Sequence, residues 1–444
     1  MNNSSAFIIF CFLTALILLL VRNLQIKKFF LLLSSVYFFI YINNIQLLIA
    51  SLVFLCLIYI INIYPSRKNV YLYICSALGI FLYLKADFAG LELKKELNEV
   101  ALPSGISFIL FQSIALLLDR KNNIIDKPVR LTDVLGAGIF YPSVLVGPFY
   151  KIQKYLSGIR NQVSSEQVYF GFYLFSFGLF KFSVSAMLIS EYFLKRTPIT
   201  RVEDLQSLVL LILSSVYLYC NFSGISDIAT GTGQMMGFNL PQNFRFPFFS
   251  TSMSEYWRKW HISLGEWFKE FVFYPLNIHL SRKLNYRLSS KISVFVVFFM
   301  IGLWHQFSLK ILVYSILNGL LVAFFSTDSV VKSRFKKFLL YMITFFLILM
   351  INGLFLSKNL NAFAEILNGL FLLSEKMNVF KNILAIITSF TLLAYCYWAE
   401  KIILRYTDEK LNSQFFMNSI IAFINLLFAI SIGLGGVNAV YTGY

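Results

Sequence analysis

Long runs of apolar residues, each close to the length that crosses a bilayer, follow one another along most of the chain. About 20 such residues span the hydrocarbon core as an α-helix. The runs are continuous rather than alternating, which favours helices over the strands of a membrane barrel. We place spans at 6–21, 29–42, 45–63, 70–84, 103–118, 133–149, 168–194, 205–221, 291–307, 309–326, 337–357, 378–398 and 415–434. Residues 360–373 form a shorter apolar stretch, which we expect to be re-entrant or interfacial.

The composition agrees with this pattern. Apolar residues make up 58% of the 444 residues and charged residues only 13%, whereas soluble domains average about 45–50% and about 25%. Too few charges are present to cover a water-soluble protein of this size. We therefore predict a single all-α polytopic membrane domain over 1–444, with N-terminal helices in 1–99, a motif-bearing core at about 100–320 and C-terminal helices in 330–444.

The chain carries 38 Lys and Arg against 21 Asp and Glu. The basic residues lie in short loops beside the spans, as membrane topology requires, so we expect lipids and no nucleic acid as partners. Loops 22–28, 64–69 and 119–132 are basic, loop 43–44 is not, and loop 85–102 balances its lysines with acidic residues. This alternation places the N-terminus outside the cytoplasm and the three basic loops inside it.

The five cysteines lie in or beside apolar runs without a CxxC pair, so we interpret them as small core residues and expect no metal site.

Between about 222 and 290 the chain becomes polar and rich in motifs, and two of its three histidines, His261 and His279, fall there. Such a backbone is tolerated at membrane depth only when protein buries it or when it lines a wet cavity. The segment is therefore predicted to form re-entrant and interfacial helices around a site. His279 is expected to lie on the surface.

Residues 254–270 are predicted to form one helix, with Ser254 as its N-cap. Its aromatic residues and His261 fall at a spacing of three to four and form one stripe. Two interpretations stay open: an interfacial helix with its tryptophans at headgroup level, or a helix that presents His261 to a site.

His305 follows the apolar run 294–304. An ionisable residue is costly in lipid and marks a functional site by default, and imidazole suits general-base chemistry near neutral pH. The alternative is a histidine at a helix end that bonds to a neighbouring span.

Five blocks, in order, resemble those of the membrane-bound O-acyltransferase family. The resemblance is nearest to its bacterial branch, which contains alginate O-acetylation proteins and the teichoic-acid D-alanyl transfer protein. The blocks are LPSGISFILFQSIALLLD (102–119), FYPSVLVGPFYKIQKY (140–155), NFSGISDIATGTGQMMGFNLPQNFRFPF (221–248), SEYWRKWHISLGEWFKEFVFYPL (254–276) and GLWH (302–305).

The resemblance implies a funnel of about 11 spans with re-entrant segments around a central histidine; together with the apolar runs, this predicts about 11–13 transmembrane helices. It implies that His305 is the catalytic histidine and His261 the second histidine of the site. The motif positions that line or brace the site would be Asp227, Ser223, Trp257, Arg258, Trp260 and Trp304. The sequence departs from the family after GLWH, and Asn318 stands where the branch has a histidine; we count Asn318 among the substrate-binding residues.

The family reaction moves an acyl group from a thioester to a hydroxyl. We expect no bound cofactor and a cytoplasmic co-substrate, either acetyl-CoA or an acyl carrier protein. His305 would act as general base, while His261 would orient the substrate or stabilise the oxyanion. Loops 119–132 and 150–160 are basic enough to attract an anionic donor, although topology alone also explains their charge.

The predicted acceptor is an extracytoplasmic polysaccharide, reached from the bacterial cytoplasmic membrane with or without an esterase-like partner protein. D-alanyl transfer from a carrier protein to teichoic acid is the alternative within the family. A lipid-linked sugar transporter or flippase is the alternative of another class, for which we would expect internal repeats.

Overall fold

The computed structural model describes residues 3–41, 45–85, 105–144, 147–186, 189, 206–306, 308–325, 333–370, 378–408 and 424–425, and its elements are α-helices and two π-helical turns. The N-terminal helices are α1 (Asn3–Leu20), α2 (Leu24–Tyr41), α3 (Ile45–Ile63) and α4 (Arg67–Lys85). The core begins with α6 (Ile106–Lys121), α7 (Leu131–Gly138), α8 (Tyr141–Val144), α9 (Ile152–Arg160), α10 (Ser165–Leu179), the π-helix η1 (Phe180–Ala186) and α11 (Ser207–Met235). It continues with α12 (Met253–Lys259), α13 (Ile262–Phe268), the π-helix η3 (Lys269–Phe273), α14 (Tyr274–Leu280), α15 (Tyr286–His305) and α16 (Leu309–Phe324). The C-terminal helices are α17 (Arg334–Leu356), α18 (Leu360–Asn368) and α19 (Val379–Asp408).

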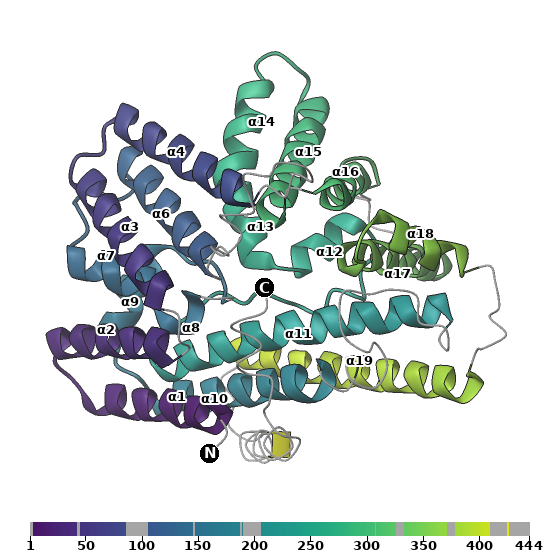
Figure 1. The fold of residues 1–444 in the computed structure, drawn as a ribbon, viewed down its shortest axis with the longest axis horizontal. Coiled ribbons are helices and arrows are strands. Elements are labelled where there is room, and N and C mark those ends of the chain that lie inside the picture. Colours follow the sequence, from purple (N-terminus) through teal and green to yellow (C-terminus); the bar gives the residue numbers. More distant parts are fainter. Residues whose placement is uncertain are drawn as a thin grey trace.

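The helices fan out around the short helices α12 and α13, as Figure 1 shows. Helices α10, α11 and α19 pack side by side in one half, and α3, α4, α6 and α7 form a second group. Helices α14, α15 and α16 form a third group. The middle of the fan is therefore lined by the segment that the sequence marks as polar and rich in motifs.

Five helices in the described part of the chain are long and apolar enough to cross a membrane: α2, α11, α15, α17 and α19. Helix α11 stands apart, because 83% of its apolar window is buried in protein, against 28–39% for the other four. Their exposed apolar faces require a lipid solvent, so the protein is a multi-pass membrane protein. The predicted all-α polytopic fold is confirmed, while the span count of about 11–13 and the orientation stay predictions.

Glycines form a close seam between α10 and α11. An added Cβ on Gly178 would lie 2.6 Å from the carbonyl oxygen of Gly224, and one on Gly231 would lie 2.5 Å from the backbone nitrogen of Phe175. Small residues allow such direct backbone contact between membrane helices.

Helix α11 is longer than the predicted span 205–221, because it continues to Met235 through the motif block. Its hydroxyl side chains donate to carbonyls one turn back, as Ser223 does to Tyr219 (2.6 Å) and Thr230 to Ser226 (2.8 Å). Polar residues therefore stay inside the helix, and the polar interruption begins near 236 rather than near 222.

Two further predictions were wrong in detail. The predicted span 133–149 is broken into α7 and the short α8, with Pro142 at the start of α8, where proline is tolerated. The predicted helix 254–270 is broken at Trp260 and His261, and its N-cap is Ser252, whose hydroxyl accepts from the backbone nitrogen of Glu255.

The short stretch 360–373 contains α18, as expected for a segment too short to span upright. The loop 86–102 and nearly all of the predicted span 415–434 lie outside the described residues.

Candidate active site

His261 occupies the break between α12 and α13. Its φ is +46°, a left-handed backbone conformation that costs a non-glycine residue about 1–3 kcal/mol. The stretch 243–246 makes two backbone hydrogen bonds across the break: the nitrogen of Ile262 donates to the Asn243 carbonyl (2.9 Å), and that of Arg245 donates to the Lys259 carbonyl (3.0 Å). Phe246, in the same stretch, also has a positive φ (+35°). Such strain collects at functional sites.

The imidazole of His261 is buried, with 3% of the residue exposed. Its Nδ1 lies 3.1 Å from Oδ1 of Asn243. Its Nε2 has no hydrogen-bond partner in the described part of the chain. His261 lies outside the long spanning helices; burial in protein lowers its pKa well below the usual range, and the nearby His305 lowers it further. The ring is therefore neutral near pH 7.

Aromatic rings surround His261. Phe149 stacks on it at 5.9 Å, Phe222 meets it edge-on at 4.7 Å, and the Trp304 ring lies 6.2 Å away. These rings come from three separate parts of the chain, and Phe149 also contacts Trp304 (6.2 Å). They exclude water from the ring faces of His261.

His305 is the last residue of α15 and is half-buried. Its ring lies 4.4 Å from that of Trp304 and 5.3 Å from that of Phe355 on α17. Trp304 therefore contacts both histidines, and the structure brings together His261, Trp304 and His305. His279, by contrast, is exposed on α14, as predicted.

Trp257 and Trp260 pack beside this group. The indole nitrogen of Trp257 donates to Oδ1 of Asn318 (3.0 Å), and Asn318 is fully buried on α16. Trp260 stacks on Tyr256 and meets Phe222, which is one of the rings around His261. These contacts tie α12 to α16 and to α11.

For the other predicted site residues, the structure describes contacts with other groups. Asp227 forms an ion pair with the fully buried Lys181 of η1, and Lys181 is 3.7 Å from Glu400 of α19. Ser223 is buried within α11. The guanidinium of Arg258 is exposed and donates to the hydroxyl of Ser254 (2.8 Å). Direct contact with the two histidines is described for none of these three residues.

The residues that position His261 most directly, Asn243 and Ser263, carried no predicted role. Asn243 Oδ1 accepts from the Ser263 hydroxyl (2.8 Å) and backbone nitrogen (3.2 Å). Both residues lie inside blocks that resemble the family, the first in NLPQNF and the second in WHIS, and so does Phe149 in GPF. The signal was present in the sequence, but only the fold shows that the three blocks meet.

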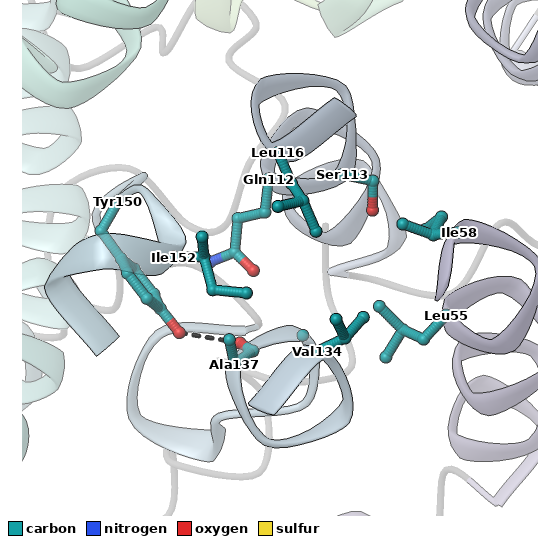
Figure 2. Close-up of a pocket in the computed structure, with 10 residues that line it drawn as sticks. Leu55, Ile58, Gln112, Ser113, Leu116, Val134, Ala137, Tyr150 and Ile152 are labelled. Carbon is teal, nitrogen blue, oxygen red and sulfur yellow. Dashed lines mark hydrogen bonds between the residues drawn. The ribbon is translucent and has the colours of Figure 1, made fainter. Parts of the chain in front are cut away.

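Figure 2 shows a separate pocket lined by residues of α3, α6 and α7 together with Tyr150 and Ile152, at the start of α9. The Tyr150 hydroxyl donates to the Ala137 carbonyl at its edge (2.7 Å), and the Gln112 amide lies in its middle. None of the predicted site residues lines it. Helix α6 therefore presents Gln112 to this pocket and Phe111 to the aromatic rings around Trp304.

In the part of the chain that the structure describes, no three His, Cys, Asp or Glu side chains gather closely enough to hold a metal ion. Cys11, Cys220 and Cys396 are buried, and Cys56 and Cys75 are exposed; all five are free thiols.

Three proteins illustrate what the chain is similar to. The teichoic acid D-alanyltransferase of Bacillus subtilis (strain 168) is 26% identical over 241 residues, which are 52% of this chain and 61% of that protein. The peptidoglycan O-acetyltransferase of Helicobacter pylori is 26% identical over 401 residues, 79% of this chain and 74% of that protein. A probable alginate O-acetylase of Pseudomonas fluorescens is 28% identical over 293 residues, 65% of this chain and 57% of that protein.

The chain thus spans between about three fifths and three quarters of the length of these relatives. The sequence model of the membrane-bound O-acyltransferase family matches residues 6–351. That match runs from α1 into α17 and includes His261 and His305. The chain therefore belongs to the membrane-bound O-acyltransferase family.

Proposed function

We propose that this protein is an O-acyltransferase of the bacterial cytoplasmic membrane that moves an acetyl group from a cytoplasmic thioester toward hydroxyls of an extracytoplasmic polysaccharide. One observation carries the proposal: the rings of His261 and His305 both contact that of Trp304, inside a group of aromatic rings. A low-dielectric site of this kind strengthens hydrogen bonds and excludes hydrolysis by water.

In the proposed reaction, the oxygen of the acceptor hydroxyl forms a bond to the carbonyl carbon of the thioester, and the carbon–sulfur bond breaks. The proton that leaves the hydroxyl passes to His305 and then to the departing thiolate. A histidine suits both transfers because its unperturbed pKa lies near neutral pH. His261 orients the substrate or stabilises the developing oxyanion.

No bound cofactor is needed, and the thioester is a co-substrate, either acetyl-CoA or an acyl carrier protein. Both donors are anionic, and exposed basic residues on the segment after α6 and on α9 would favour their approach; these include Lys127, Lys154 and Arg160. Other basic residues there are already paired, as Lys151 is with Glu270 (2.5 Å). The N-terminus would face away from the cytoplasm.

Two relatives are named for O-acetylation, of peptidoglycan and of alginate, and one for D-alanyl transfer to teichoic acid. D-alanyl transfer from a carrier protein is therefore the second candidate. An extracytoplasmic esterase-like partner would complete the transfer if the acceptor is not reached directly.

The central test is His305→Ala. We expect the loss of a general base to reduce acyl transfer by about 10²–10⁴-fold while the protein still inserts and accumulates. Transfer is measured with radiolabelled acetyl-CoA, and separately with a D-alanyl carrier thioester, on membranes and the native cell envelope. The matched control is His279→Ala, which removes an exposed histidine. Unchanged transfer in His305→Ala would contradict the role of His305, and transfer of D-alanine alone would favour the second candidate.

A further inference from the structure

One side-chain oxygen organises the surroundings of His261. Oδ1 of Asn243 lies 2.8 Å from the Ser263 hydroxyl, 3.2 Å from the Ser263 backbone nitrogen and 3.1 Å from Nδ1 of His261. Asn243 is itself buried, with 2% exposed. Its backbone carbonyl accepts from the backbone nitrogen of Ile262, the residue between His261 and Ser263. The asparagine therefore has a fixed position relative to the imidazole.

These contacts determine which atoms carry hydrogen. A backbone N–H can only donate, so the atom of Asn243 that meets the Ser263 nitrogen must be the amide oxygen rather than the amide nitrogen. An amide oxygen can only accept, so Nδ1 of His261 must be the donor. In a neutral imidazole the other nitrogen then has no hydrogen. Nε2 is left with a lone pair.

That lone pair has no partner among the residues that the structure describes. Within them, Nε2 is buried and makes no hydrogen bond, although an unpaired buried polar atom is costly. The ring contacts of His261 are with Phe149, Phe222 and Trp304. The titratable group that acts on it electrostatically is His305.

We propose that Asn243 is a positioning residue that holds His261 in the Nδ1–H tautomer, so that Nε2 accepts a hydrogen bond from an O–H or N–H group of the bound substrate. The inference rests on the proposed acyl transfer and separates the two roles left open for His261. A neutral ring without hydrogen on Nε2 cannot donate to an oxyanion from that atom, whereas it can hold a substrate donor. The proton passed to His305 is a different one.

The tautomer can be measured without any activity. Histidine labelled with ¹⁵N is incorporated into the full chain in lipid nanodiscs, and ring ¹⁵N spectra are recorded near pH 7. The chain has three histidines, so His279→Gln and His305→Gln assign the signals of His261 by elimination. We expect a protonated Nδ1 and an unprotonated Nε2. A protonated Nε2 would overturn the proposal.

Two substitutions then connect the tautomer with catalysis. Asn243→Leu removes the oxygen, so we expect a mixture of tautomers and a loss of transfer by about 10- to 100-fold at every pH. Asn243→Asp keeps an acceptor oxygen but places a carboxylate beside Nδ1, which favours the charged imidazole and raises the pKa of His261. Because a protonated Nε2 cannot accept, the acid limb of the pH–rate profile should move to higher pH, with transfer recovered above it.

A merely structural role for Asn243 would make the two variants alike at all pH values, and that result would also overturn the proposal. Ser263→Ala removes the hydroxyl that donates to Asn243 (2.8 Å) and accepts from the backbone nitrogen of Phe149 (2.9 Å), but it leaves the Asn243–His261 pair, so the tautomer should stay unchanged. Asn277→Leu is the control for a lost buried asparagine, since Asn277 accepts from Ser289 (2.8 Å) away from His261. If wild-type protein transfers no acyl group, the proposed function fails, while the ¹⁵N spectra still decide the tautomer.

Discussion

Two buried polar clusters in this protein differ in charge and in how far their polar atoms are paired. Around His261, the described groups are neutral, and none of them is a hydrogen-bond partner of Nε2 of the histidine. Around Lys181, one ammonium faces the carboxylates of Asp227 and Glu400. Glu400 further accepts from the Tyr219 hydroxyl and from the backbone nitrogen of Phe246 (2.5 Å).

The difference indicates what each cluster serves. The charges around Lys181 are paired within the fold and join η1, α11, α19 and the stretch 243–246, so we interpret this cluster as a structural joint. The cluster at His261 keeps an unused acceptor at a strained backbone position, which is expected where a ligand completes the site. Asp227, which the family resemblance places at the site, forms an ion pair in the Lys181 cluster.

The largest expected loss of stability follows from a substitution in the Lys181 cluster. Lys181→Met leaves two buried carboxylates without their cation, and we expect a loss of about 3–5 kcal/mol of stability, measured as a lower thermal midpoint in detergent and lower accumulation. The transfer rate per folded molecule should change little.

The triple variant Lys181→Met, Asp227→Asn, Glu400→Gln removes all three charges and should recover most of that stability. If Lys181→Met instead kept its stability and lost transfer selectively, the interpretation of the Lys181 cluster as structural would be wrong.

A smaller effect is expected at Asn318, which accepts from Trp257 beside the site. Asn318→Leu leaves the indole N–H without its acceptor and should cost about 1–3 kcal/mol. Asn318→His restores an acceptor of the kind that the resemblance places at this position, and should cost less. Thermal midpoints of the two variants check this order, and equal midpoints would show that the Trp257 hydrogen bond contributes nothing.

The smallest effect is expected at the cap of the helix that precedes His261. Ser252→Ala removes the hydroxyl that accepts from Glu255 (3.1 Å) and should cost about 1 kcal/mol. Ser254→Ala, the control, removes only an exposed contact with Arg258. A lower thermal midpoint for Ser254→Ala than for Ser252→Ala would instead support the predicted N-cap, Ser254.

Much of the fold could be predicted because apolar runs map directly onto helices: the predicted spans 45–63 and 309–326 match α3 and α16 to within a few residues. The break at His261 could not, since the aromatic spacing on both sides fits a continuous helix. It is imposed by hydrogen bonds from residues 243 and 245, which are distant in the sequence.

The candidate site was predictable to a similar extent. The family resemblance identified both histidines and Trp304, which lie together in the fold. It did not indicate that Asp227 pairs with Lys181, because Lys181 lies in none of the five blocks. Nor did it identify Asn243, whose role depends on which of its atoms faces Nδ1.

The glycine seam between α10 and α11 has a mechanical consequence. With backbone against backbone at Gly178 and Gly224, neither helix can slide or rotate without driving a side chain into its neighbour's main chain. Asp227 of the Lys181 cluster and Phe222, which touches His261, both lie on α11 of this pair. The close α10–α11 contact therefore fixes the position of both side chains relative to α10.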